Sequence, residues 1–359
     1  MANVDRVNEI LYAYNDAGLI DDEELLLLAD RNVRRNPYFP YWHYARFDLE
    51  QMDDDECKAE FRFKKEDVYT LLDALHLPPE IRVYNGVVFD SVEALCILLR
   101  RLSYPCRYGD LIPRFGRPVP QLSMISNKLV GMLHTRFGYL LRNLDQPWLS
   151  RANLKAYADA IHQTGAALDN CWGFIDGTVR PICRPKQNQR AVYNGHKRVH
   201  AIKFQSVVAP NGLIANLFGP VEGRRHDSAL LAMSGLLPQL AEYSFSPEGQ
   251  ALCLYGDPAY PHRVHLQRPF PRRPYLTPEE HAFNQSMSRV RVSVEWIFGD
   301  IINSFKFMDF KKNQKIGLSP VGQFYIVSAL LRNANTCLYG SSTSEYFNLQ
   351  PPALGDYFI

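Results

Sequence analysis

The sequence predicts an α/β protein in which a helical region precedes a mixed β-sheet with helices on both faces. Helical spacing of apolar residues dominates up to about residue 168, whereas short apolar runs bounded by turn residues begin at residue 172. The first of these runs are joined by a hairpin turn, and a later one follows a helix. Hairpin-linked strands pair antiparallel and strands reached across a helix pair parallel, so the predicted sheet is mixed.

Length and composition indicate an ordinary globular chain. It has 359 residues, 46% of them hydrophobic, which is enough for a full core and for two or three units. No apolar run is long enough for a membrane helix, and the first residues lack the pattern of a signal peptide, so we expect a location inside the cell. The seven cysteines include no C-x-x-C pair, which argues against a disulfide framework and a structural zinc site.

Residues 1–60 form an acidic leader. They carry 6 Lys and Arg against 15 Asp and Glu, while the rest of the chain carries 34 against 23. Residues 5–30 read as helical, and the aromatic, proline-containing segment 36–42 reads as an arm that needs a surface to pack on. An acidic leader before a basic body suits a polyanion-binding protein, although solvated helix ends explain the leader equally simply.

Residues 61–150 are predicted to be helical, with helices at 65–75, 91–102, 108–115 and 123–137. A glycine-containing turn at 116–120 separates the last two, and arginines lie nearby. Two helices joined by such a turn resemble a helix-turn-helix DNA-binding unit. An ordinary helical bundle with surface arginines is an equally good reading of this region.

Residues 151–340 carry the predicted sheet. A helix at 151–168 leads into strands at 172–176, 179–183, 199–208 and 213–218, with a hairpin turn at 209–212. A helix at 227–236, capped by Asp227, precedes a strand at 251–255, a proline-rich loop at 258–278, and helices at 278–305 and 320–338. This order is typical of an RNase H-like core, and residues 341–359 are left as a C-terminal tail.

Three carboxylates stand out in this pattern. Asp176 and Asp257 each end an apolar run that reads as a strand, and Glu295 lies in the helix whose buried stripe is Val290, Val294, Ile297 and Ile301. Each has a simpler explanation: a turn residue, an Asx turn, and an ion pair with Arg291 one helical turn away. Carboxylates gathered at strand ends repel one another unless a cation is present, so their conjunction favours a metal site.

Basic residues surround the first of these acids. Such a surface neutralises phosphates and contributes salt-dependent affinity for nucleic acid. The candidate DNA-binding residues are Arg180, Arg184, Lys186, Arg190, Lys197, Arg198, Lys203, Arg224, Arg225 and Arg291. A lysine-rich stretch at 311–315 is either a nuclear import signal or a solvated loop.

Residues 172–338 resemble the catalytic domain of PIF/Harbinger transposases and their domesticated relatives, a branch of the DDE superfamily. The resemblance lies in five ordered motifs: Phe-Ile-Asp-Gly-Thr at 174–178, Tyr-Asn-Gly-His-Lys at 193–197, Gly-Arg-Arg-His-Asp-Ser at 223–228, Gly-Asp-Pro-Ala-Tyr-Pro at 256–261, and Phe283-Asn284 followed by the 291–299 segment. The helical region before the domain is similar to that of the family as well. Trp296 and Met287 depart from the family's usual Arg and His.

The resemblance implies a catalytic and metal-binding triad of Asp176, Asp257 and Glu295, with a pair of Mg2+ or Mn2+ ions. It implies hydrolysis at the ends of a DNA element and transfer of the 3′-hydroxyl ends into an A/T-rich target. It also implies a nuclear location, a Myb/SANT-like DNA-binding partner and a homo-oligomer. Asp227 is either a further metal-binding acid or a helix cap. A domesticated, catalytically idle DNA- or protein-binding factor is the alternative function.

Overall fold

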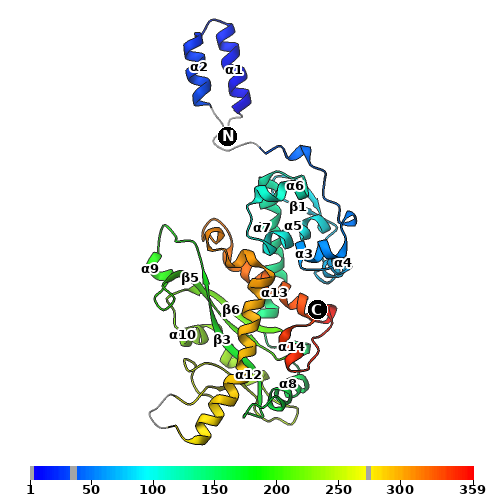
Figure 1. Cartoon of the computed structure of the whole chain (residues 1–359), viewed down its shortest axis with the longest axis vertical. Coiled ribbons are helices and arrows are strands. Elements are labelled where there is room, and N and C mark those ends of the chain that lie inside the picture. Colours follow the sequence, from blue (N-terminus) through cyan, green and yellow to red (C-terminus); the bar gives the residue numbers. More distant parts are fainter. Residues whose placement is uncertain (1–3, 33–38, 272–275) are drawn as a thin grey trace.

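We describe the fold from a computed structural model, which covers residues 4–32, 39–271 and 276–359. A helical hairpin at the N-terminus stands clear of a body that contains a helical region and a sheet region (Figure 1). Buried residues of both regions of the body form one continuous hydrophobic core. The mixed α/β fold with a mixed sheet is therefore confirmed.

The N-terminal hairpin consists of α1 (Val4–Asp16) and α2 (Asp22–Arg31), close to the predicted helical span. Asp21 caps α2 and forms a capping box with Glu24, which satisfies backbone amides at the helix start. No residue of α2 is buried: Leu26, Leu27 and Leu28 are exposed, and Leu25 is half-buried. The hairpin therefore adds nothing to the core of the body.

The segment after the predicted aromatic arm packs on the helical region, whereas Phe39 and Trp42 of the arm are 44% and 52% exposed. Residues 36–38 of the predicted arm lie outside the described residues; beyond them come short 3₁₀ turns at Tyr41–His43 and Leu49–Gln51. The Phe47 ring lies 5.0 Å from that of Phe115, and Arg46 donates to the Gly116 carbonyl. Gly116 has φ +57°, and a Cβ there would lie 2.9 Å from the Tyr44 carbonyl oxygen, so the predicted turn needs glycine on both counts.

The helical region largely follows the prediction. It contains α3 (Asp54–Phe61), α4 (Lys65–Ala74), β1 (Glu80–Arg82), β2 (Val88–Asp90), α5 (Ser91–Ser103), α6 (Ile112–Phe115) and α7 (Val119–Phe137). The helix predicted to lead into the sheet, α8 (Arg151–Gln163), packs on the sheet itself. The β1–β2 hairpin was not predicted, because each strand has only three residues. The helix predicted at 108–115 is shorter than expected. Only the single turn α6 precedes Gly116, and the 3₁₀ turn Tyr108–Leu111 comes before it.

Arginines of this region are paired with acids inside the protein. Arg114 bridges Glu56 and Glu60 at 2.6 and 2.8 Å, and Arg117 pairs with Glu93 at 2.6 Å. Glu56 and Glu60 belong to the acidic leader, so part of its negative charge neutralises the helical region. These guanidinium groups are therefore occupied in the protein itself.

The sheet has the strand order β4-β5-β3-β7-β8. The remaining strand, β6, pairs with β5, as β4 also does. The strands are β3 (Cys171–Pro181), β4 (Tyr193–Asn194), β5 (Val199–Val208), β6 (Ile214–Glu222), β7 (Cys253–Tyr255) and β8 (Leu266–Gln267). β3, β5 and β6 pair antiparallel, whereas β7 runs parallel to both β3 and β8. The predicted strands 172–176 and 179–183 are one continuous strand, β3. Residues 171–175 are all buried, so both faces of β3 are covered.

Helices and the C-terminal segment surround the sheet (Figure 1). They are α9 (Gln189–Val192), α10 (Asp227–Ser234), α11 (Leu236–Tyr243), α12 (Pro278–Ser304), α13 (Val321–Tyr339), α14 (Ser342–Tyr346) and α15 (Leu354–Tyr357). Short 3₁₀ turns at Gly138–Leu141, Pro147–Leu149, Lys306–Asp309 and Lys311–Asn313 complete the described structure. None of the helices in the described ranges has the length and hydropathy needed to cross a bilayer.

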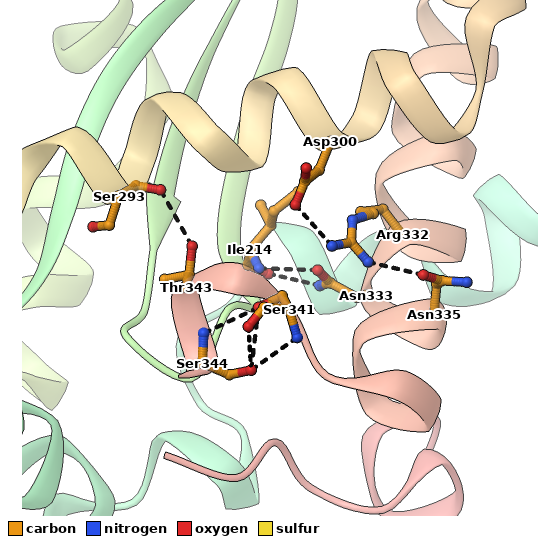
Figure 2. A network of polar contacts seen from close by, with 9 residues as sticks. All are labelled: Ile214, Ser293, Asp300, Arg332, Asn333, Asn335, Ser341, Thr343 and Ser344. Carbon is orange, nitrogen blue, oxygen red and sulfur yellow. Dashed lines mark hydrogen bonds and ion pairs between the residues drawn. The ribbon is translucent and has the colours of Figure 1, made fainter. Parts of the chain in front are cut away.

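A polar network ties α12 to α13, α14 and the sheet (Figure 2). Thr343 donates to the Ser293 carbonyl of α12 at 3.3 Å, and Arg332 of α13 pairs with Asp300 at 2.8 Å. Asn333 bonds both the amide and the carbonyl of Ile214 at 2.9 Å. The rotation of α12 about its axis is therefore set by contacts on two of its turns.

The segment after residue 340 is packed into the body, although the sequence suggested a tail. Phe347, Tyr357 and Phe358 are buried, and the Tyr357 hydroxyl accepts a hydrogen bond from Asn333 at 2.8 Å. The C-terminal residues thus complete the core around β6 and α13.

Candidate functional site

Asp176 and Asp257 lie level with one another on neighbouring parallel strands. β3 and β7 pair in the register Phe174 with Tyr255, and each acid comes two residues after its member of that pair. Neighbouring strands are about 5 Å apart, so the two carboxylates meet at the carboxyl end of β7. Asp176 lies inside β3, which continues to Pro181 along β5, whereas Asp257 follows the end of β7 as predicted.

Arg291 of α12 pairs with Asp176. Its Nη2 lies 2.9 Å from Asp176 Oδ2, and the two side chains are 21% and 19% exposed. The Gly177 amide donates to Asp176 Oδ1 at 2.8 Å. Burial raises the pKa of the Asp176 carboxyl; Arg291 and the Gly177 amide oppose that rise, and the negative charges of Asp257 and Asp227 add to it.

Asp227 is the third acid near Asp176. A Cβ added to Gly177 would lie 2.9 Å from Asp227 Cγ, which shows that the carboxylate packs against the backbone next to Asp176. Its Oδ1 pairs with Lys203 Nζ at 2.6 Å. The prediction that Asp227 caps the helix is wrong: α10 begins at Asp227, and its N-cap, His226, makes no side-chain capping bond. The helix starts one residue earlier than a cap at Asp227 requires, because an N-cap residue precedes the first helical residue.

Glu295 lies one helical turn after Arg291, on a more exposed side of α12. The buried face of α12 includes Met287, Val290, Ile297 and Ile301, as predicted except for Val294, whose side chain lies outside the described residues. Each helical residue turns by about 100°, so Arg291 flanks the buried face and Glu295 is a further ~40° toward solvent. Glu295 is exposed, and within the described residues no hydrogen bond or ion pair joins it to Asp176 or Asp257.

A pocket of about 510 Å³ opens beside the acids, between β7 and α12. Asp257, Arg291, Asn284 and Ser288 line it, together with the proline-rich loop. Asn284 holds that loop by bonding the amide and the carbonyl of Phe270 at 2.8 and 3.1 Å. Asn284 belongs to the fifth sequence motif, but the motif alone does not indicate this role in the loop.

Two buried tyrosines lie behind the acids. The hydroxyls of Tyr255 and Tyr260 have no hydrogen-bond partner among the described residues. Burial raises the pKa of Tyr260 far above its ordinary value, and the charges of Asp227, Asp176 and Asp257 raise it further. Burial raises the pKa of Tyr255 to about 12. Both side chains are therefore neutral at physiological pH.

The structure brings the five sequence motifs together. Asn194 donates to the Gly223 carbonyl at 2.8 Å, which joins the second motif to the third. Gly256 of the fourth motif packs on Ile175 of the first motif: a Cβ at Gly256 would lie 2.8 Å from Ile175 Cγ2. Contacts already described join Asp227 to Gly177 and Arg291 to Asp176. Glycines at these positions allow the close approach of neighbouring segments.

The predicted basic residues fall into two groups. Lys203 is 5% exposed and donates to Asp227 and the Arg225 carbonyl, so its ammonium group is occupied inside the protein, and its contact with DNA stays a prediction. Arg180 bonds Thr178, Arg225 pairs with Glu222, and Arg291 pairs with Asp176. The other group is exposed, and we call it the basic arm. Its members are Arg184, Lys186, Arg190, Lys197, Arg198 and Arg224. All but Arg224 belong to the segment between β3 and β5 that contains α9 (Figure 1).

The acids have the right chemistry for a divalent metal but not the arrangement. Carboxylate oxygens are ligands that Mg2+ and Mn2+ favour. Each acid of the cluster is already held by the protein: Asp176 by Arg291, Asp227 by Lys203, and Asp257 by the Ala259 amide at 3.0 Å. Within the described ranges, no group of three or more His, Cys, Asp or Glu side chains is placed to hold a metal ion.

Comparison with known proteins gives one match. Residues 175–333 match the family model described as DDE superfamily endonuclease, a span that contains Asp176, Asp227, Asp257 and Glu295. Neither the curated proteins nor the solved structures include a match. DDE nucleases generally use divalent metal ions and act on DNA. The match therefore supports the assignment of residues 175–333 to the DDE superfamily of endonucleases.

Proposed function

We propose that this protein is a metal-dependent DNA endonuclease and transposase of the PIF/Harbinger type, which hydrolyses phosphodiester bonds at element ends and transfers the 3′-hydroxyl ends to target DNA. The observation that carries the proposal is the level placement of Asp176 and Asp257 inside the segment that matches DDE endonucleases. The five motifs that resemble the Harbinger branch meet at the same edge of the sheet, which supports the subtype.

The topology supports an RNase H-like core. β3, β5 and β6 form an antiparallel meander, and β7 and β8 extend the sheet in parallel on the other side of β3. Asp176 lies in the central strand, β3, and Asp257 follows the end of its parallel neighbour, β7. The α6–Gly116–α7 unit is our candidate for the helix-turn-helix, although Arg114 and Arg117 are already paired with glutamates.

The residues of the chain divide the work by position. The basic arm would hold phosphates of the duplex without reading its sequence. The pocket beside Asp257 would receive the strand to be cut, with Asn284 keeping its wall in place. Asp176 and Asp257 would face the scissile phosphate from the sheet edge. Positioning of reacting groups is the contribution expected of the protein in such chemistry.

The test is nicking of supercoiled plasmid DNA with Mg2+ or Mn2+. We expect cleavage by the wild type and its loss in Asp176→Asn and Asp257→Asn, with folding checked by circular dichroism. Glu295→Gln and Asp227→Asn, tested in parallel, identify the third acid: loss in the first supports the family triad, and loss in the second supports the acid next to Gly177. Undiminished cutting by Asp176→Asn would refute the proposal.

A second candidate is a catalytically idle DNA-binding factor that keeps the fold. It is favoured by one observation, that protein groups already hold all three acids of the cluster. The two candidates differ in metal uptake. Calorimetry should show Mn2+ binding that requires Asp176 for the nuclease and none for the idle factor.

We further propose a nuclear location, because the substrate is DNA. A Myb/SANT-like partner belongs to the same proposal: contacts of the basic arm with phosphates would not read bases, so a partner would supply sequence specificity. A homo-oligomeric state is proposed as well. Gel filtration with light scattering, and DNA binding with and without the partner, test these points.

A further inference from the structure

The pocket beside Asp257 has walls that suit a flat ring. Its volume of about 510 Å³ lies in the range of pockets that hold small ligands. The apolar part of its wall consists of Tyr255, Phe270 and three prolines of the loop after β7. The Phe270 ring is 39% exposed, and its centroid lies 5.2 Å from that of Phe283 in an edge-on contact. A part-exposed aromatic ring in a pocket wall offers a surface on which another flat ring can stack.

Hydrogen bonds fix the loop that carries this wall. Arg268 donates to the Pro258 carbonyl at 3.2 Å, near the start of the loop. Asn284 of α12 bonds both the amide and the carbonyl of Phe270. The prolines also restrict the backbone of the loop, because each fixes its own φ. The wall is therefore formed before a ligand binds, which lowers the entropy cost of binding.

Tyr255 brings an unpartnered hydroxyl to the pocket. The side chain is 1% exposed, and the hydroxyl has no hydrogen-bond partner among the described residues. Burial raises the pKa of Tyr255 to about 12, so the hydroxyl keeps its proton and can donate it. The Nε of Arg291, another residue of the wall, is likewise buried without a partner in the described part of the chain. Buried polar groups are normally paired, so these two donors point to a ligand with acceptor atoms.

The charges around the pocket favour a neutral ligand over an anion. Asp176 already neutralises the Arg291 guanidinium at 2.9 Å, and Asp257 adds a carboxylate to the wall. A phosphate inside the pocket would place a further negative charge beside that carboxylate, which is unfavourable. A nucleobase is flat and uncharged, and its carbonyl oxygens and ring nitrogens accept hydrogen bonds. Among the parts of a DNA strand, the base therefore matches the pocket best.

We propose that the pocket between β7 and α12 binds a single nucleobase that leaves the duplex next to the bond to be cut, with the base stacked on Phe270 and an acceptor atom bound to the Tyr255 hydroxyl. This inference rests on the proposed function, because the base comes from the DNA substrate. Extrusion of a base breaks its pairing and stacking, so it is easiest where the base is mismatched. Stacking on Phe270 and the hydrogen bond from Tyr255 offset that cost.

The test measures binding of short fluorescent duplexes to the full-length protein by anisotropy, in EDTA so that no DNA is cut. The probes share one sequence and are fully paired, carry a central thymine–thymine mismatch, or carry two opposed abasic sites at the same place. The abasic pair makes the duplex flexible but offers no base. We expect the wild type to bind the mismatched duplex about tenfold more tightly than the abasic one, as for stacking of one base on an aromatic ring. The fully paired duplex should also bind more weakly than the mismatched one.

Two variants assign this preference to the pocket. Phe270→Ala should lose most of it, whereas Phe310→Ala should keep it, because Phe310 is also 39% exposed but does not line the pocket. Tyr255→Phe should lower the preference about threefold, as for loss of one neutral hydrogen bond. It should leave the urea midpoint unchanged, since the hydroxyl has no partner among the described residues.

The outcomes separate this inference from the proposed function. Equal affinity of the wild type for the mismatched and the abasic duplex overturns the inference, as does a preference that Phe270→Ala retains; plasmid nicking by the wild type would still support the nuclease. A preference that depends on Phe270 without any nicking supports the base pocket and refutes the nuclease. Binding to none of the probes overturns both.

Discussion

Replacement of Gly177 by Ala should break the ion pair between Asp227 and Lys203. Gly177 lies in the extended backbone of β3, so alanine is compatible with its main-chain conformation. The new Cβ would lie 2.9 Å from Asp227 Cγ and closer still to Oδ1, which is held by Lys203 at 2.6 Å. The carboxylate cannot stay in place, and Lys203 is only 5% exposed.

The expected loss in the free energy of unfolding depends on the contacts that Lys203 keeps in Gly177→Ala. Removing one partner of a fully buried ion pair costs about 3–5 kcal/mol. Lys203 keeps its bond to the Arg225 carbonyl at 2.9 Å, and the Asp227 side chain is 26% exposed and can turn to water. We therefore expect a loss of about 1–3 kcal/mol in the free energy of unfolding, including the strain of the added methyl group.

A double-mutant cycle isolates this mechanism. Urea denaturation is measured for the wild type, Gly177→Ala, Asp227→Ala and the double variant. In the Asp227→Ala background the carboxylate is absent, so Gly177→Ala should cost less than about 0.5 kcal/mol. An equal cost in both backgrounds would show that the methyl group clashes elsewhere, and no cost in either would refute the close contact itself.

Three further outcomes are expected. Asn333→Ala should lower the free energy of unfolding by about 2–4 kcal/mol, because it leaves the buried amide and carbonyl of Ile214 without partners; Asn335→Ala, at a part-buried site on the same helix, should cost less in the same urea titration. The pKa of Asp176 in the folded protein is raised above 3.8. Without metal, the wild type should therefore lose stability relative to Asp176→Asn as pH rises from below 3.8 through the folded pKa. The measurement is the thermal midpoint of both proteins against pH, and parallel curves would contradict the expectation. Gln replacements at Arg184, Lys186, Lys197 and Arg198 should reduce the salt dependence of DNA binding by about 0.9 in log–log slope for each charge that contacts a phosphate, and an unchanged slope would place the DNA elsewhere.

The sequence alone could predict that Asp176 and Asp257 lie side by side. Each follows a short apolar run that reads as a strand, and residues at the ends of neighbouring strands lie close together. The strand Val199–Val208 and the hairpin turn after it were predicted with their limits, since the alternation and the Pro-Asn-Gly turn residues are strong signals. By contrast, two predicted strands merged into β3, because Gly177 looks like a turn but serves as a point of close contact.

The remaining features depend on tertiary contacts that no local pattern carries. Lys203 occupies a strand position where a basic residue suggests exposure, but Asp227 and the Arg225 carbonyl compensate its buried charge. Arg291 and Glu295 are one helical turn apart, so periodicity places both beside the apolar face. Which of them faces Asp176 is decided by packing of α12 against β3 and by the network around Ser293 and Asp300.

The burial of the C-terminal segment links its order to that of the sheet. Tyr357 supports Asn333, and Asn333 in turn satisfies the backbone of β6 at Ile214. Local unfolding of residues 354–358 would therefore also loosen this end of β6, although the two segments lie far apart in the chain.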